Sequence, residues 1–551
     1  MKLWRHFCIV IVFLSACSGL AARVVYLNVT EREFLQEQGD ARSIRTEVLP
    51  AYRGVVYDRF GEALAVSTPV VGIWTDPSLG GLDRAAVDAL AGVLDLDANR
   101  LAADLQRNAA REFLYLKRRV PWDVAQRVRR LDLAGIYYQS EYRRYYPASE
   151  TAAHVVGITG IDDEGLEGIE LSFEKILRGK PGRKTVLKDL YGDTVKDLEF
   201  TAAPEYGHDL TLSLDLRLQF LAYRELKAAV ASHRAVSGSL VMLDVRTGEI
   251  LALVNQPSYN PNEIGRDSAS GMRNRAVTDT YEPGSTIKPF TVLAALESGR
   301  FRRDSLIETA PGYFWVRNKL IEDPINRGTI SLETALTKSS QVGIAKVALA
   351  IDERAVYDVL TRVGISEFPA TGLPGEVAGT LTDAGLDNPV MRATLAYGYG
   401  LAITPLQLAQ AYLCLATGGV RLPVSILKQD GPVGGERKFD EALIRSLLEM
   451  MEGVTAPAGT APKAHIAGYR VAGKTGTVRK VGESGYDDER HVAWFAGIAP
   501  VSAPRIVAVV LINEPRGQAK GGGQVAAPVF SRVVGRTLRL LGEMPDERRA
   551  I

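Results

Sequence analysis

The first feature in the pattern of hydrophobic and polar residues is an apolar stretch near the start of the chain. Residues 7–22 carry no charge and are mostly apolar, with Lys2 and Arg5 before them and Arg23 after them. With Leu3 and Trp4, the stretch approaches the ~20 residues that a membrane-spanning helix needs. The basic flank favours a cytoplasmic N-terminus. We therefore predict a cytoplasmic tip and transmembrane anchor over residues 1–22, with the rest of the chain outside.

Two other interpretations of this stretch stay open. A cleavable signal peptide would need a small-x-small cleavage site, and no clean one ends the run. Leu14-Ser15-Ala16-Cys17 resembles the lipobox of bacterial lipoproteins. We favour the uncleaved anchor because apolar character resumes over residues 24–27.

Residues 23–235 mix helical and extended patterns and are expected to form a non-catalytic pedestal of mixed α/β structure. Residues 31–44 predict a polar helix, and residues 53–61 a strand with a Gly turn. Residues 84–133 place apolar positions at helical spacing, and residues 137–146 look extended. A helix over residues 214–232 closes this module.

Residues 236–545 begin and end with strand patterns and are helical between them. Two apolar runs, residues 239–244 and 249–254, flank a turn at Gly248 and predict a hairpin. Three more strands follow late in the chain, at residues 471–477, 491–499 and 505–513, before a closing helix over residues 525–541. We predict an α+β domain with one five-stranded antiparallel sheet flanked by helices. We expect residues 546–551 to form a short C-terminal tail.

Composition narrows the class of protein. The 551 residues suffice for about three domains, and 46% hydrophobic with 24% charged residues is a globular balance. The net charge of +1 lacks the basic excess that nucleic-acid binding needs. Cys8, Cys17 and Cys414 give the folded part no internal disulfide. The histidines show no paired ligand spacing, so we predict no metal and no cofactor.

Three short motifs occur along the chain in an order that is typical of a serine acyl-transfer site. Ser285 and Lys288 form Ser-x-x-Lys, residues 339–341 read Ser-Ser-Gln, and residues 474–477 read Lys-Thr-Gly-Thr. Ser-x-x-Lys also occurs at Ser172 and Ser425, so one match alone is weak. The ordered set, with its flanking Gly and Pro residues, carries the prediction.

The first motif supplies a nucleophile and a base. A serine hydroxyl needs a base within hydrogen-bond reach, and residues i and i+3 share a helix face, so Lys288 should reach Ser285. Burial and a second cation, Lys474, would favour the neutral amine. Pro283-Gly284 lets a helix start at Ser285, whose backbone N–H can form half of an oxyanion hole. Pro289 must distort the first turns, because it lacks a donor.

The Lys474 motif is expected on an edge strand. Gly473 and Gly476 would let a ligand backbone approach, while Thr475, Thr477 and Lys474 suit a substrate carboxylate. Residues 468–475 also match the P-loop pattern, which would indicate a nucleotide-binding phosphotransferase. That interpretation requires a helix opening at Gly473, and Gly476 argues against one.

With these residues the chain resembles the class B penicillin-binding proteins, peptidoglycan D,D-transpeptidases. It is most similar to the cell-division branch, the FtsI-type enzymes or penicillin-binding protein 3. The resemblance runs along the whole chain in family order, and its further segments are residues 53–59, 144–147, 165–175, 282–290, 398–407, 473–477 and 527–530.

The resemblance implies a role for each motif residue. Ser285 would attack the carbonyl between two D-alanines of a stem peptide, and Lys288 would take its proton. The backbone N–H groups of Ser285 and Thr477 would hold the oxyanion, and Ser339 with Lys474 would relay a proton to the departing D-alanine. The residues that would bind the substrate are Gln341, Thr475, Gly476 and Thr477. A second stem peptide's amine would then complete the crosslink, and β-lactams would trap Ser285.

One residue departs from the family pattern. The middle motif is usually Ser-x-Asn, and Gln341 adds a methylene that moves the amide by more than roughly 1 Å. This leaves a second hypothesis open, a catalytically weakened division-site scaffold that binds partners through its pedestal. A β-lactamase would need a deacylating base, and no carboxylate is assignable to that role.

The resemblance also implies partners and a location. It points to a single-pass protein of the bacterial inner membrane, with a periplasmic catalytic domain at the division septum. The implied partners are peptidoglycan stem peptides, β-lactams, a multipass SEDS-type glycosyltransferase and other division proteins.

Overall fold

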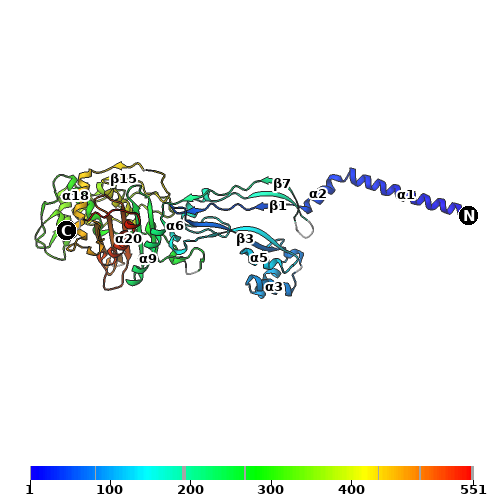
Figure 1. Cartoon of the computed structure of the whole chain (residues 1–551), viewed down its shortest axis with the longest axis horizontal. Helices are drawn as coiled ribbons and strands as arrows, with labels where there is room; N and C mark the ends of the chain where they lie inside the picture. Colours follow the sequence, from blue (N-terminus) through cyan, green and yellow to red (C-terminus); the bar gives the residue numbers. More distant parts are fainter. Residues whose placement is uncertain are drawn as a thin grey trace. The chain divides into compact units, whose positions relative to one another are not determined.

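The computed structural model describes residues 2–80, 82–188, 194–265, 268–431, 433–482 and 485–547. The chain forms two compact units that interleave along the sequence (Figure 1). The first unit comprises Met1–Arg53, Ser67–Arg143 and Arg178–His208, and the second Gly54–Val66, Arg144–Leu177 and Asp209–Ile551. The contiguous pedestal over 23–235 stays a prediction, and residues 548–551 of the expected tail lie outside the described residues.

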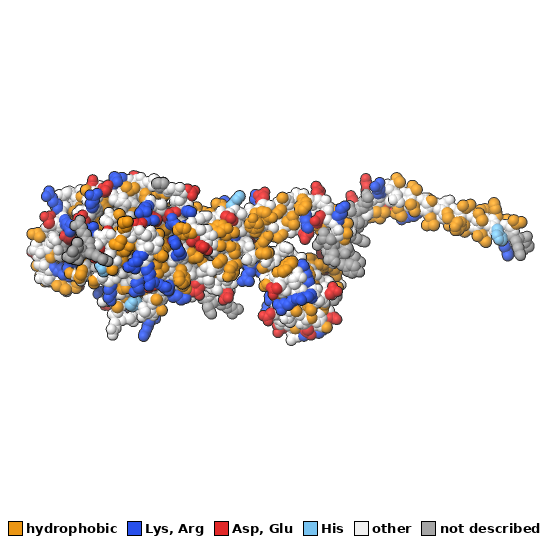
Figure 2. All heavy atoms as spheres, in the orientation of Figure 1, with side chains coloured by type: hydrophobic (Ala, Val, Ile, Leu, Met, Phe, Trp, Pro, Cys, Tyr) orange, Lys and Arg blue, Asp and Glu red, His pale blue; other side chains and the backbone are white. Residues whose placement is uncertain are grey.

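The first unit starts with the predicted apolar helix, α1 (Lys2–Val29), which continues past residue 22. It is long and apolar enough to cross a membrane. Its apolar side chains, among them Phe7, Ile9 and Phe13, are exposed along its length (Figure 2). The predicted polar helix follows as α2 (Arg32–Ser43). A three-stranded antiparallel sheet then joins β1 (Ile44–Leu49), β6 (Gly182–Lys188) and β7 (Thr194–Ala202).

The rest of this unit packs three helices against strands. The helices are α3 (Arg84–Leu94), α4 (Ala98–Arg107) and α5 (Trp122–Arg129), and Ile73 and Leu90 are fully buried in their shared core. The helical prediction for 84–133 is wrong at β4 (Leu114–Val120), where Val120 pairs with Val71 of β3 (Ala63–Thr75). Pairing with a neighbouring strand overrides the local pattern there. The extended stretch predicted next is β5 (Ile136–Tyr145).

The second unit is built on the predicted five-stranded antiparallel sheet, in the order β10-β9-β19-β18-β17. The bounds are β9 Ser237–Asp244, β10 Ile250–Gln256, β17 Ala472–Gly482, β18 Gly485–Ala499 and β19 Ile506–Asn513. Alternate residues of β9 enter two different cores, because side chains alternate across a strand. Leu240 lies in the core with α9 (Leu216–Ser232) and α20 (Ala527–Leu540), and Val241 in the core with α17 (Pro405–Ala416).

Helices between the hairpin and the late strands complete this unit. They are α12 (Lys288–Glu297), α13 (Leu332–Thr337), α14 (Gln341–Ala350), α15 (Ala355–Arg362), α16 (Pro389–Ala396), α17 and α18 (Glu441–Thr455). Short strands interrupt this region and were not predicted, among them β11 (Leu306–Glu308), β12 (Tyr313–Val316), β13 (Lys319–Glu322) and β14 (Thr329–Ser331). They form two two-stranded sheets, β11 with β14 and β12 with β13.

The remaining elements are short. They comprise β2 (Val56–Tyr57), β8 (Leu210–Thr211), α6 (Ala153–Val156), α7 (Gly168–Ser172), α8 (Glu174–Leu177), α10 (Ala269–Met272), α11 (Arg275–Thr278), β15 (Val420–Arg421), β16 (Glu436–Arg437) and α19 (Gly522–Val525).

Candidate active site

Ser285 lies in a short 3-10 turn, η4 (Gly284–Ile287), that leads directly into α12. Pro289 stands in the first turn of α12, where no backbone donor is needed. The distortion predicted from Pro289 corresponds to the 3-10 turn that directly precedes α12. Gly284 has φ +53° and its N–H donates to Gly398 O at 3.0 Å, which fixes the turn.

Lys288 is fully buried and points toward the second motif. Its Nζ donates to Ser339 O at 2.6 Å and to Ser339 Oγ at 3.1 Å. Among the residues the structure describes, no hydrogen bond joins the Ser285 and Lys288 side chains, unlike the direct contact expected from their spacing. The Lys288 amine donates instead to the two Ser339 oxygens.

Lys474 approaches the same hydroxyl from β17. Its Nζ donates to Ser339 Oγ at 3.0 Å and to Thr475 O at 3.2 Å, and the side chain is fully buried. Ser339 itself has φ +58°, a left-handed conformation that is unfavourable for a residue with a Cβ. The fold thus holds a strained serine with its hydroxyl shared by two lysines.

Burial makes both amines unusually easy to deprotonate. It lowers the pKa of Lys288 to about 7, and the negative charge of Asp323 opposes that shift. Burial, with the nearby charge of Lys288, also lowers the pKa of Lys474 well below its ordinary value. A lysine with a pKa near neutrality can serve as a general base. The contrast is Cys414, where burial raises the pKa of the thiol to about 12 and keeps it unreactive.

The Lys474 motif forms part of β17, which is the edge strand predicted for it. Its glycines also allow close packing within the protein. A Cβ on Gly476 would lie 2.8 Å from Pro283 O, and one on Gly473 would lie 2.6 Å from the Phe495 ring. Protein atoms therefore fill the space beside both glycines, and Gly476 lets the turn that carries Ser285 pack directly on β17.

The two threonines of the motif differ in exposure. Thr477 is exposed, and its Oγ1 accepts a hydrogen bond from Gly522 N at 3.0 Å, which leaves its O–H free to donate. Thr475 is mostly buried, and its Oγ1 donates to Thr460 Oγ1 at 3.2 Å. Because Gly473 to Thr475 lie within a strand, no helix opens there, and the P-loop interpretation is wrong.

Gln341 begins α14 and lines a cleft of ≈ 460 Å³ together with Thr477. Its side-chain amide makes no hydrogen bond within the described part of the chain, so it is free to meet a ligand. Other residues of the cleft were not predicted as site residues: Lys319, Leu320, Glu322, Thr394, Tyr397, Tyr399, Arg479, Tyr486 and His491. Of these residues, only Tyr399 could have been found from the sequence, because it lies in the segment at residues 398–407 that carries the family resemblance.

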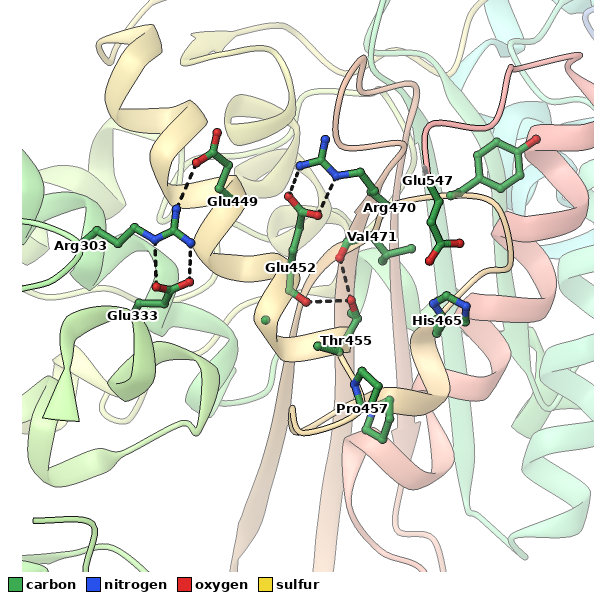
Figure 3. Close-up of a pocket in the computed structure, with 14 residues that line it drawn as sticks. Arg303, Glu333, Glu449, Glu452, Thr455, Pro457, His465, Arg470, Val471 and Glu547 are labelled. Carbon is green, nitrogen blue, oxygen red and sulfur yellow. Dashed lines mark hydrogen bonds and ion pairs between the residues drawn. The ribbon is translucent and has the colours of Figure 1, made fainter. Parts of the chain in front are cut away.

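A larger cavity, of ≈ 780 Å³, lies away from the motifs beside α18 (Figure 3). Its charged side chains face one another: Arg303 pairs with Glu333 at 2.6 Å and Arg470 with Glu452 at 2.6 Å. Thr455 Oγ1 donates to Val471 O at 2.8 Å, just before β17. None of the predicted site residues lines this cavity, and the Thr455–Val471 bond ties α18 to the residue before the strand that carries Lys474.

Known families match both parts of the chain. The penicillin binding protein transpeptidase domain matches residues 238–535, and the penicillin-binding protein dimerisation domain matches residues 48–212. Lys288, Ser339 and Lys474 all lie within the first match.

Individual proteins agree with this assignment. The chain is 42% identical to the peptidoglycan D,D-transpeptidase FtsI of Escherichia coli (strain K12) over 550 residues, covering 98% of this chain and 93% of that protein. It is 39% identical to the probable peptidoglycan D,D-transpeptidase PbpC of Pseudomonas aeruginosa, over 98% of this chain and 96% of that one. The apo structure of the transpeptidase domain of penicillin-binding protein 3 from Burkholderia pseudomallei matches with a TM-score of 0.56 and 39% identity, covering 61% of this chain and 98% of that domain.

The geometry and the sequence relationships lead to the same conclusion. The chain belongs to the penicillin-binding proteins, within the FtsI-type peptidoglycan D,D-transpeptidases.

Proposed function

We propose that this protein crosslinks peptidoglycan stem peptides through an acyl-enzyme on Ser285 and is inhibited by β-lactams. One observation carries the proposal: Ser339 Oγ lies within hydrogen-bond distance of both Lys288 and Lys474. Two buried amines around one hydroxyl can accept and return a proton near neutral pH. The catalytically weakened scaffold is not favoured, because the similar proteins are D,D-transpeptidases and the transpeptidase domain matches residues 238–535.

Acylation would use Ser285 and Lys288. Ser285 Oγ attacks the carbonyl between the two terminal D-alanines while neutral Lys288 takes its proton. The backbone N–H groups of Ser285 and Thr477 stabilise the oxyanion, because donors aimed at developing charge lower the barrier. The C–N bond then breaks, and Ser339 with Lys474 delivers a proton to the leaving D-alanine. Thr477, Thr475, Gly476 and Gln341 hold the substrate.

Transfer would reverse these steps with a new amine. The amine of a neighbouring stem peptide attacks the Ser285 ester and gives up a proton to the lysines. The ester C–O bond breaks, Ser285 recovers its proton, and an amide crosslink is formed. A β-lactam follows the acylation step only, since its leaving amine stays tethered within the ester and blocks the incoming nucleophile.

The helix α1 and the family together fit a single-pass inner-membrane protein. We further propose that the catalytic domain is periplasmic and acts at the division septum. The proposed partners are a SEDS-type glycosyltransferase and other division proteins, which would supply glycan strands to the site.

Labelling with a fluorescent penicillin, followed by a chase, tests the function. Wild-type protein should form a covalent adduct that persists through the chase, and Ser285→Ala should form none. Equal labelling of the two proteins would defeat the proposal, and rapid loss of label from the wild type would indicate a hydrolase instead.

A further inference from the structure

The β12–β13 hairpin divides its side chains between two faces, because successive residues of a strand point to opposite sides. Phe314 and Ile321 pair across the two strands, and Val316 lies on the same face as Phe314. Val316 and Ile321 are buried in a core that includes residues of α14 and α16, and Phe314 packs against that core. This inner face therefore fixes the hairpin on α14, the helix that begins with Gln341.

The outer face of the hairpin consists of Tyr313, Trp315, Leu320 and Glu322. Trp315 pairs with Leu320 across the strands, and Tyr313 pairs with Glu322. The side chains of Tyr313 and Trp315 are 50% and 62% exposed, although both are large and aromatic. Within the described part of the chain, neither ring makes a side-chain hydrogen bond or a contact with another ring. The outer face thus places two neighbouring aromatic rings in solvent on a rigidly anchored hairpin.

The outer face continues into the candidate active site. Leu320 and Glu322 also line the cleft of ≈ 460 Å³ that contains Gln341 and Thr477. A group of exposed apolar side chains beside a cleft is typical of a surface that binds a ligand or a partner. A ligand on the outer face would therefore be continuous with one in the cleft.

Sugar rings fit this face better than a protein partner does. Under the proposed function, the stem peptide that enters the cleft is attached to a glycan strand, so sugar lies near the entrance. The face of an aromatic ring carries partial negative charge and attracts the polarised C–H bonds on one face of a sugar ring. Glu322, the Tyr313 hydroxyl and the Trp315 indole N–H can bind sugar hydroxyls. A protein partner would instead seat anchor side chains in pockets, whereas these two rings stand exposed on a strand pair.

We infer that the outer face of the β12–β13 hairpin binds the glycan strand that carries the stem peptide, with Trp315 and Tyr313 stacking on its sugar rings. The inference rests on the proposed function and adds a saccharide subsite outside the three motifs. Residues i and i+2 of a strand lie about 6.7 Å apart on one face. The two rings can therefore contact neighbouring sugars of a single strand while its peptide extends into the cleft.

The test is the binding of chitohexaose, a β-1,4-linked oligomer of N-acetylglucosamine, to the full-length protein in a detergent without a sugar headgroup. Isothermal titration calorimetry should show saturable binding to the wild type. Trp315→Ala should bind at least about fivefold more weakly, because one stacking contact is lost. Trp315→Phe retains a ring and should bind within about twofold of the wild type. Trp315→Leu is apolar but has no ring, and should bind as weakly as Trp315→Ala.

Trp122 on α5 offers a matched control, since its side chain is 59% exposed. Trp122→Ala should bind chitohexaose as the wild type does. Each of these variants changes an exposed side chain, so its thermal unfolding midpoint should stay within about 2 °C of the wild type. A loss of affinity at an unchanged midpoint would then come from the outer face and not from unfolding.

The outcomes separate the inference from the function. No binding of millimolar chitohexaose to the wild type, or equal affinities of the wild type and Trp315→Ala, would overturn the inference. Equal affinities of Trp315→Leu and Trp315→Phe would also overturn it, because the face would then be a general apolar surface, such as one that docks a protein. A wild type that labels with fluorescent penicillin but does not bind chitohexaose would keep the function. An unlabelled wild type would remove the function and the inference with it.

Discussion

Lys288 Nζ donates to two atoms of Ser339, the carbonyl oxygen at 2.6 Å and the hydroxyl oxygen at 3.1 Å. This double contact ties the base of the first motif to the second motif before any substrate is present. Because Lys474 donates to the same hydroxyl at 3.0 Å, the three side chains form one hydrogen-bonded group. The following predictions depend on that arrangement.

The rate of acylation should depend on pH through Lys288. Burial lowers the pKa of this amine to about 7, and only the neutral amine can take the Ser285 proton. The second-order rate constant for penicillin acylation should therefore rise as pH increases through about 7 and then level off. A rate that stays constant from acidic to alkaline pH would exclude Lys288 as the base.

Ser339→Ala should slow acylation by about 10²–10³-fold, because the two lysines lose their shared acceptor. Lys288 would retain the Ser339 carbonyl, so the fold around α12 should persist. Ser331→Ala is the matched control: Ser331 caps α13 and accepts from Thr334 N at 3.1 Å, away from the lysines. Wild-type rates of labelling in Ser339→Ala would contradict the account.

Gln341→Asn should raise the second-order rate of penicillin acylation about fivefold, which is the worth of roughly one neutral hydrogen bond. The shorter amide would stand where the family usually places it. The Gln341 side chain makes no hydrogen bond to any described residue, so stability should change by less than about 0.5 kcal/mol. Slower acylation by Gln341→Asn would mean that this site is adapted to the longer side chain.

Gly398→Ala should damage both stability and acylation, since Gly398 has φ +89° and a Cβ there would lie 2.0 Å from Gly284 O. Gly400 has φ +76° with nothing within 4 Å, so Gly400→Ala carries the backbone strain without the clash. Gly400→Ala should cost about 1 kcal/mol, and Gly398→Ala about 1–3 kcal/mol more. Thermal unfolding and labelling should rank the two proteins in that order, and equal midpoints would refute the argument.

The sequence predicted β9, β10 and β19 because these strands are long and apolar. Residues 506–513 of β19 are buried at every position. A continuous run rich in Val, Ile and Leu indicates such a strand, buried on both faces. The strands β11 to β14 have only three or four residues each, too few for a period to be recognised. The strand β4 carries Lys117, Arg118 and Arg119 in its centre, and only its pairing with β3 makes it a strand.

The site was predictable where chemistry needs a fixed spacing along the chain. Ser285 and Lys288 are linked by one turn, and Lys474 lies in a recognisable motif. Asp323 had no such signal, because the fold of a hairpin brings it to α14. The same holds for the contact of Lys288 with Ser339, which joins residues 51 positions apart.

Mass spectrometry of the penicillin adduct tests the central claim most directly. After incubation with benzylpenicillin, the intact protein should gain the mass of one β-lactam, and peptide mapping should place it on Ser285 as an ester. An adduct on another residue, or an unmodified protein, would contradict the assignment of Ser285 as the nucleophile.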